Sequence, residues 1–293
     1  MKNHDLLRTS LALLAGMLLG TAQAQSPYPS AEQAADALIK AIIAKDQAGY
    51  ARVLGADWKR LLPPGGVSAE DRQAFLDLAA QATKVNVIKD GRAALSVGAT
   101  DPYTLPIPIA QGKDGQWRFD IKGGREAMLD RRIGLNERSA MQAALAYVDA
   151  QREYALADRN GDGMLEYAQK FVSSPGKRDG LIWPQSLGDE SPMGEDLVPT
   201  KPGEGYHGYH FKILQGQGPA AASGERSYLI GKRMSSGYAL LAWPVQYGKT
   251  GVMSFIVNQD GQLFERDLGP ATAQAAAGIR RFNPDEGWAK TKP

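Results

Sequence analysis

The chain has 293 residues, of which 43% are hydrophobic and 23% are charged, and it contains no cysteine. This composition excludes collagen-like, intrinsically disordered and disulfide-stapled proteins. Because 34 Lys and Arg nearly balance 32 Asp and Glu, and the two signs alternate along the chain, neither a nucleic-acid-binding nor a membrane-surface field is indicated.

The first segment, residues 1–24, is predicted to be a cleaved signal peptide. Basic residues precede an apolar run over 11–19, and the small residues Ala22 and Ala24 follow it. The run is shorter than the roughly 20 apolar residues that a membrane-spanning helix needs. We therefore expect cleavage after Ala24, export of a mature chain that begins at Gln25 and no transmembrane segment in the mature chain.

Residues 25–133 are predicted to form an N-terminal α+β domain. Helical periodicity begins after Ser30, continues over 46–54 and returns over 68–82. The pattern then changes to short strand-like runs separated by turn residues, which predicts a small antiparallel sheet. The expected strands cover 85–88, 93–97, 105–109 and 117–120.

Residues 134–293 are predicted to form a second α+β domain. A long helix is expected from Asn136 to about Ala157, and its alanine-rich composition predicts burial on most sides. From Tyr206 onward the chain has the alternation typical of an antiparallel meander. The expected strands cover 209–214, 226–230, 238–245, 252–258 and 263–266. One long helix packed on this meander is the predicted core.

Several long runs resemble an exported family of Gram-negative bacteria known as domain of unknown function 2950. They are AYVDAQREYALADRNGDGMLEYAQKF, SSPGKRDGLIWP, GYHGYHFKIL and GYALLAWPVQYGKTGVMSFIVNQDGQLFERDLG. The resemblance covers essentially the whole mature chain and implies a periplasmic protein, but it carries over no catalytic residue. The second domain is also similar to the globular part of type II secretion pseudopilins, which implies a similar order of helix and strands.

The strongest chemical motif is a loop directly after the long helix, where oxygen-bearing residues alternate as in the first part of a calcium loop. The candidate metal ligands are Asp158, Asn160, Asp162, the carbonyl of Met164 and Glu166. Gln169 stands where a calcium loop usually has a bidentate Glu, which predicts weak affinity. The alternative is a bare turn in which Asp158 and Asn160 cap the chain.

No catalytic constellation stands out from the sequence. Cysteine chemistry is excluded, and no GxSxG motif is present. The weak catalytic candidates are His207, Glu153 and Asp179. His210 is expected to face solvent from its strand, and the polar loop 176–180 is expected to pair its charges internally.

The leading hypothesis is a non-enzymatic periplasmic module for binding or envelope assembly, with a weak calcium site and an envelope protein or small ligand as its partner. The alternative is a periplasmic hydrolase with an interdomain active site. A buried pocket that contains His207 and a carboxylate would favour the hydrolase. An exposed aromatic face with Tyr238, Trp243 and Tyr247 would favour the binding module.

Overall fold

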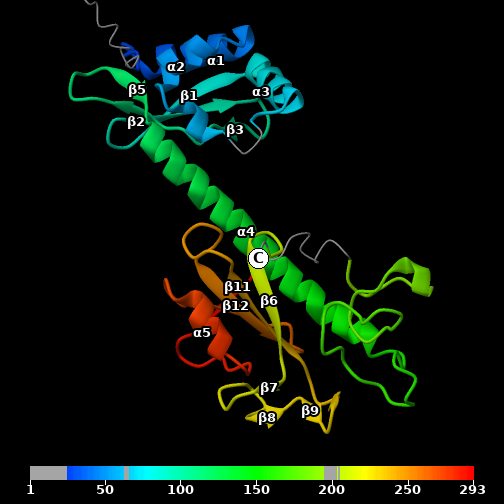
Figure 1. Cartoon of the computed structure of the whole chain (residues 1–293). Coiled ribbons are helices and arrows are strands. Elements are labelled where there is room, and N and C mark those ends of the chain that lie inside the picture. Colours follow the sequence, from blue (N-terminus) through cyan, green and yellow to red (C-terminus); the bar gives the residue numbers. More distant parts are fainter. Residues whose placement is uncertain (1–24, 63–65, 195–202, 204) are drawn as a thin grey trace, which may run out of the picture. The chain divides into compact units, whose positions relative to one another are not determined.

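The computed structural model describes residues 25–62, 66–194, 203 and 205–293, so the expected signal peptide over 1–24 lies outside the described residues. The chain divides into two compact units, Met1–Ala127 and Met128–Pro293. Helices and antiparallel sheets make up both, which confirms the predicted α+β class (Figure 1). The observed boundary between the units lies a few residues before the expected one at 133/134.

In its described residues, the first unit has helices followed by a small antiparallel sheet and then the start of the long helix. Its helices are α1 (Ala31–Ala44), α2 (Gln47–Leu54), η1 (Trp58–Leu61) and α3 (Ala69–Gln81). Its strands are β1 (Thr83–Ile88), β2 (Arg92–Val97), β3 (Tyr103–Thr104), β4 (Ile109–Gln111) and β5 (Trp117–Phe119). The strand order is β1-β2-β4-β5, with β3 paired to β2.

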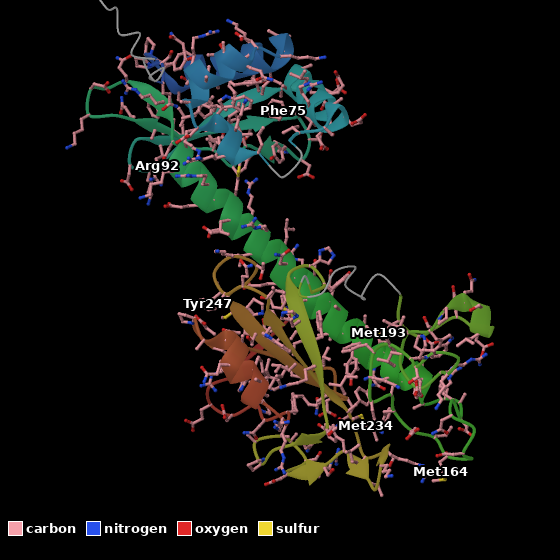
Figure 2. The ribbon with its side chains drawn as sticks, viewed as in Figure 1. Phe75, Arg92, Met164, Met193, Met234 and Tyr247 are labelled. Carbon is pink, nitrogen blue, oxygen red and sulfur yellow. The ribbon has the colours of Figure 1, made fainter. Side chains whose placement is uncertain are left out.

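Local capping explains why the helices of the first unit begin where the sequence predicts. The Ser30 hydroxyl accepts a hydrogen bond from the Gln33 N–H, and the Ser68 hydroxyl accepts one from the Asp71 N–H. The α1 helix buries Leu38 and its alanines against the sheet, whereas Phe75 on α3 stays only half-buried (Figure 2). The core of this unit therefore lies between α1 and the sheet.

The expected strand over 105–109 is wrong. The chain pairs at β3 and again from β4, but the residues between them form no ladder. Pro106 and Pro108 interrupt this stretch, and proline has no N–H to donate to a neighbouring strand.

The long helix α4 (Ile121–Tyr154) begins well before the predicted start at Asn136 and ends before the predicted end at Ala157. The Asp120 carboxylate accepts a hydrogen bond from the Gly123 N–H at 2.9 Å, which caps the helix at its true start. Asn136 lies inside the helix and donates instead to the carbonyl of Thr250 at 2.9 Å. A residue typical of helix starts thus holds a distant loop.

Burial on most sides of the long helix is also a wrong prediction, because only one stripe of its second half is covered. Arg152 and Glu153 are exposed on the other side. The buried residues of this stripe are Ala140, Ala143, Ala144, Tyr147, Val148, Ala150, Gln151 and Tyr154. This one-sided pattern is typical of a helix that packs on a single sheet.

The second unit is built on a five-stranded antiparallel sheet in the order β14-β13-β12-β11-β6. These strands are β6 (Tyr209–Leu214), β11 (Ala239–Pro244), β12 (Met253–Asn258), β13 (Leu263–Asp267) and β14 (Ala289–Thr291). The smaller elements are η2 (Gln185–Leu187), β7 (Gly216–Gln217), β8 (Arg226–Ser227), β9 (Leu229–Ile230), β10 (Arg233–Met234) and α5 (Thr272–Gly278). The expected strand over 226–230 is divided into β8 and β9, and α5 and β14 were not predicted.

The sheet of the second unit is covered by a helix on each face. On one face the Tyr147 hydroxyl of α4 donates to the Ala239 carbonyl, and the Tyr238 hydroxyl donates to the Val148 carbonyl. On the other face α5 lies beside β11 (Figure 1), and Lys212 of β6 donates from its Nζ to the Ala276 carbonyl at 2.5 Å. The predicted packing of the long helix on the meander is confirmed.

Candidate functional site

The Asp158 carboxylate organises the predicted calcium loop through backbone hydrogen bonds. Its Oδ1 accepts from the N–H groups of Gly161 and Asp162 at 2.8 and 3.2 Å, and its Oδ2 accepts from Gly163 at 2.7 Å. Gly161 and Gly163 adopt φ values of 75° and 83°, which favour glycine. The bond from Gly163 makes the largest contribution to lowering the pKa of Asp158.

The other side chains of this loop also find partners. The Asn160 Nδ2 donates to the Glu166 Oε1 at 2.6 Å. The Asp162 Oδ2 accepts from the Nε and Nη2 of Arg233 at 2.9 and 2.7 Å, and this contact is the main cause of its lowered pKa. Met164 is 54% exposed at the outer part of the loop (Figure 2).

The structure thus brings all five predicted ligands into one loop, but in the arrangement of a hydrogen-bonded turn. Burial, and next the charge of Asp162, raises the pKa of Glu166, which indicates crowding of negative charge. Among the described residues, no group of three His, Asp or Glu side chains is placed to hold a metal ion. Arg233 and the Asn160 amide thus engage carboxylate oxygens of two predicted ligands, Asp162 and Glu166.

The three candidate catalytic residues do not meet. His207 is exposed in a left-handed turn, where its ring contacts that of Tyr206. Glu153 is exposed on α4, and Asp179 forms an ion pair with the Nζ of Lys170 at 2.7 Å. Across the part of the chain that the structure describes, no hydrogen bond or ion pair joins any two of these three residues.

The charges of the 176–180 loop pair with residues outside it, which corrects the expected internal pairing. Arg178 forms an ion pair with Asp189 at 2.9 Å and lies over the Trp183 ring. Arg159 lies over the same ring, 5.5 Å from its centroid. These contacts pack the loop after α4 onto the core of the second unit.

His210 is half-buried, so the expected solvent-facing position is wrong. Its ring lies 5.4 Å from the ring of Trp243, on the sheet face that α5 partly covers, and burial lowers the pKa of His210. Tyr238 is only 1% exposed. Tyr238, Trp243 and Tyr247 therefore do not form the exposed aromatic face that the sequence suggested.

A cavity of about 560 Å³ in the second unit was missed by the sequence analysis. It opens beside α5, and its walls come from the turn after β7, strands β12 and β13, and the segment between α5 and β14. Its apolar lining includes Ile256, Leu268, Ile279 and Trp288, and its charged lining comprises Arg266, Arg280, Arg281 and Asp285. Apolar and charged groups thus converge on one space.

Hydrogen bonds between distant segments hold the walls of this cavity. The Gly218 N–H donates to the Phe282 carbonyl, and the Ala220 N–H donates to the Asn283 Oδ1, both at 2.9 Å. A Cβ on Gly218 would lie 2.4 Å from that same Asn283 oxygen, so only glycine allows this approach. The cavity is therefore preformed by the fold.

Within the described residues, no helix combines the length and apolar character needed to cross a membrane. No curated protein and no solved structure matches the chain. One family does match, over residues 25–291, which is nearly the whole sequence. The chain belongs to the family described as Protein of unknown function (DUF2950).

Proposed function

We propose that this protein is a non-enzymatic binding module of the bacterial periplasm, and that the cavity beside α5 holds its ligand. The observation that carries the proposal is the preformed cavity of about 560 Å³, in which apolar side chains lie next to charged ones. Small-molecule sites in proteins usually have this size and this combination of groups. The leader-like pattern of residues 1–24 supports export.

Binding is tested with a heat-treated, ultrafiltered extract of small molecules from the periplasm. The extract should raise the melting temperature of the wild type but raise that of Gly278→Trp less, because this variant adds an indole at a position that lines the cavity. A Cβ at Gly278 or Gly134 meets no atom within 4 Å, so Gly134→Trp is a matched control outside the cavity. An equal response of Gly278→Trp and the wild type would contradict the proposal.

Export is tested by fractionation of cells and N-terminal sequencing. The proposal expects a periplasmic protein that begins at Gln25, because Ala22 and Ala24 are the small residues that a signal peptidase accepts. An intact Met1 in the periplasmic fraction would refute cleavage, and recovery only from the cytoplasm would refute export.

The hydrolase alternative needs a base beside a carboxylate. In this alternative, His207 is the base. The exposed ring of His207 contacts Tyr206, however, and the Asp179 carboxylate forms an ion pair with Lys170. These contacts support the binding module over the hydrolase. A His207→Gln variant that folds normally but loses its cellular phenotype would instead favour the hydrolase.

A second proposal is weak calcium binding by the Asp158 loop. It is favoured by the Asp158 carboxylate, which already holds three backbone N–H groups and keeps the tight turn that such a site needs. At about 10 mM calcium, roughly 100 times a dissociation constant of about 0.1 mM, binding to the folded state adds about 2.7 kcal/mol. A melt in millimolar calcium should therefore exceed one in chelator, and the difference should vanish in Asp158→Asn/Asp162→Asn.

A variant of Arg233 gives a sharper calcium experiment, because Arg233 forms an ion pair with Asp162. Arg233→Met should increase calcium affinity, since the ion no longer has to displace a guanidinium. An identical melt of the wild type in calcium and chelator would mean that the loop is only a turn. A calcium response that survives in the double aspartate variant would place the ion elsewhere.

A further inference from the structure

We propose that the ligand of the cavity beside α5 is a small amphipathic anion, with a carboxylate or phosphate head at Arg280 and an apolar body against Trp288 and Ile279. This inference rests on the proposed binding function and adds the chemical class of the ligand. It follows from the charge, the apolar lining and the limited volume of the cavity.

The charge of the lining selects an anion. Three arginines and one aspartate line the cavity, which leaves an excess of positive charge. Arg266 lies 3.6 Å from Asp285, and Arg281 pairs with Glu225. Arg280, in contrast, has no ion-pair partner among the described residues. Its guanidinium is therefore the group best suited to receive an anionic head.

A second positive charge lies near Arg280. Lys212 reaches the end of α5 from β6, and burial together with the charge of Arg280 lowers the pKa of the Lys212 ammonium. The two cations therefore repel each other. An anion beside Arg280 would relieve this repulsion, because it would place a negative charge near both cations.

The carbonyl groups at the end of α5 could oppose an anion, but they are already occupied. The Ala276 carbonyl accepts from the Nζ of Lys212 at 2.5 Å and from the Ile279 N–H at 3.3 Å. The Ala277 carbonyl accepts from the same Nζ at 3.4 Å. Lys212 therefore places a positive charge against the negative end of this short helix.

The apolar lining requires a ligand with an apolar body. Ile279 and Trp288 line the cavity and are only partly buried against the core, to which the buried Ile256 belongs. A bare inorganic anion would leave these side chains in contact with water and would gain nothing from them. An apolar chain or ring would remove the exposed surface of Ile279 and Trp288 from water, which is favourable in proportion to the apolar area buried.

The test is calorimetric titration of the mature protein with five probes that separate head from body. Octanoate and octyl phosphate carry both, 1-octanol carries only the body, and acetate and inorganic phosphate carry only a head. Octanoate or octyl phosphate should bind at least about tenfold more tightly than the other three. The tighter of these two identifies the head group.

Variants place the binding in the cavity. Arg280→Gln should weaken the amphipathic anions by about tenfold, the usual size of one hydrogen bond to a charged group. Trp288→Ala should weaken them further than Trp288→Phe. Arg138→Gln removes the same charge from an exposed position on α4 outside the cavity and should leave affinity unchanged.

Three outcomes would overturn the inference. Octanol could bind as tightly as octanoate, or Arg280→Gln could behave like Arg138→Gln, and either result would mean that the cavity does not recognise the charge. In the third outcome, none of the five probes binds, although the periplasmic extract still raises the melting temperature of the wild type more than that of Gly278→Trp. That result would reject the amphipathic anion but keep the binding module, whereas failure of the extract as well would reject both.

Discussion

The Asp158 loop and the cavity beside α5 handle charge in opposite ways. In the loop, backbone N–H groups satisfy Asp158, and Arg233 satisfies Asp162. At the cavity, Arg280 has no ion-pair partner within the described part of the chain and lies beside apolar side chains. The comparison teaches that charged residues in a recognisable motif can be paired by other groups of the same protein. The cavity, in contrast, has no local sequence motif that would announce a binding site.

If protein contacts hold the Asp158 region, the largest loss of stability should come from changing Gln151, which is fully buried and bonds to Ala168 just after the loop. Its side-chain amide donates to the Ala168 carbonyl and accepts from the Ala168 N–H, both at 2.8 Å. Gln151→Ala would leave both groups buried without a partner, so the free energy of unfolding should fall by about 2–4 kcal/mol. Denaturant unfolding in chelator measures this.

Gln169→Ala is the control for this prediction. The Gln169 amide also donates to a carbonyl, that of Lys232, but it does so at an exposed position. Its loss should cost less than about 0.5 kcal/mol. Equal costs for the two glutamines would mean that the buried contact does not anchor the loop.

The cavity wall should respond to Gly218→Ala. The new Cβ would lie within 3 Å of three side-chain atoms of Asn283, so the asparagine must move and release the Ala220 N–H. We expect a loss of about 1–2 kcal/mol in unfolding free energy and weaker octanoate binding. Gly194→Ala, where a Cβ meets nothing within 4 Å, should change neither. Unchanged stability of Gly218→Ala would argue against a rigid wall.

A smaller effect is expected from the pH dependence of His210. Burial lowers the pKa of this imidazole in the folded state, so its contribution to stability is complete above the ordinary pKa of about 6.5. The contribution is lost as the pH falls from there through the folded-state pKa, because the unfolded chain then binds the proton more tightly. In urea unfolding between pH 8 and pH 5, the free energy of unfolding should therefore depend less steeply on pH in His210→Gln than in the wild type.

His207→Gln is the matched control, since the other histidine of this segment is exposed. It should keep the slope of the wild type. If His207→Gln removes the slope and His210→Gln keeps it, the packing of His210 on Trp243 has no part in the pH response.

The smallest effect concerns Glu166. Its pKa is raised by burial and by Asp162, so its favourable contribution is present below the ordinary pKa and is lost as the pH rises through the folded-state value. At neutral pH in chelator, Glu166→Gln should therefore be more stable than the wild type, by about 0.5 kcal/mol or less. The same variant should gain less from calcium. A loss of stability in chelator would show that the Asn160 bond to Glu166 outweighs the repulsion.

Helix starts were predictable where one nearby side chain decides them. Ser30 and Ser68 cap α1 and α3 through bonds that span three residues, so the signal is entirely local. The start of α4 was misread because Asn136 has the character of a cap, although its amide bonds to Thr250. The competing contact is 114 residues away in sequence and left no trace in the local pattern.

By itself, the sequence determined that five oxygen-bearing groups lie together in the Asp158 loop, because glycine turns and alternate spacing act within nine residues. Only the tertiary structure decided that Arg233, 71 residues from Asp162 in sequence, donates a hydrogen bond to the Asp162 carboxylate. It also decided the cavity, whose lining runs from Gly218 to Trp288 across a turn, two strands and a helix. Side chains so far apart in sequence converge only when the sheet and α5 are packed. Which arginines find an acidic partner also depends on that packing, because the partners come from distant segments.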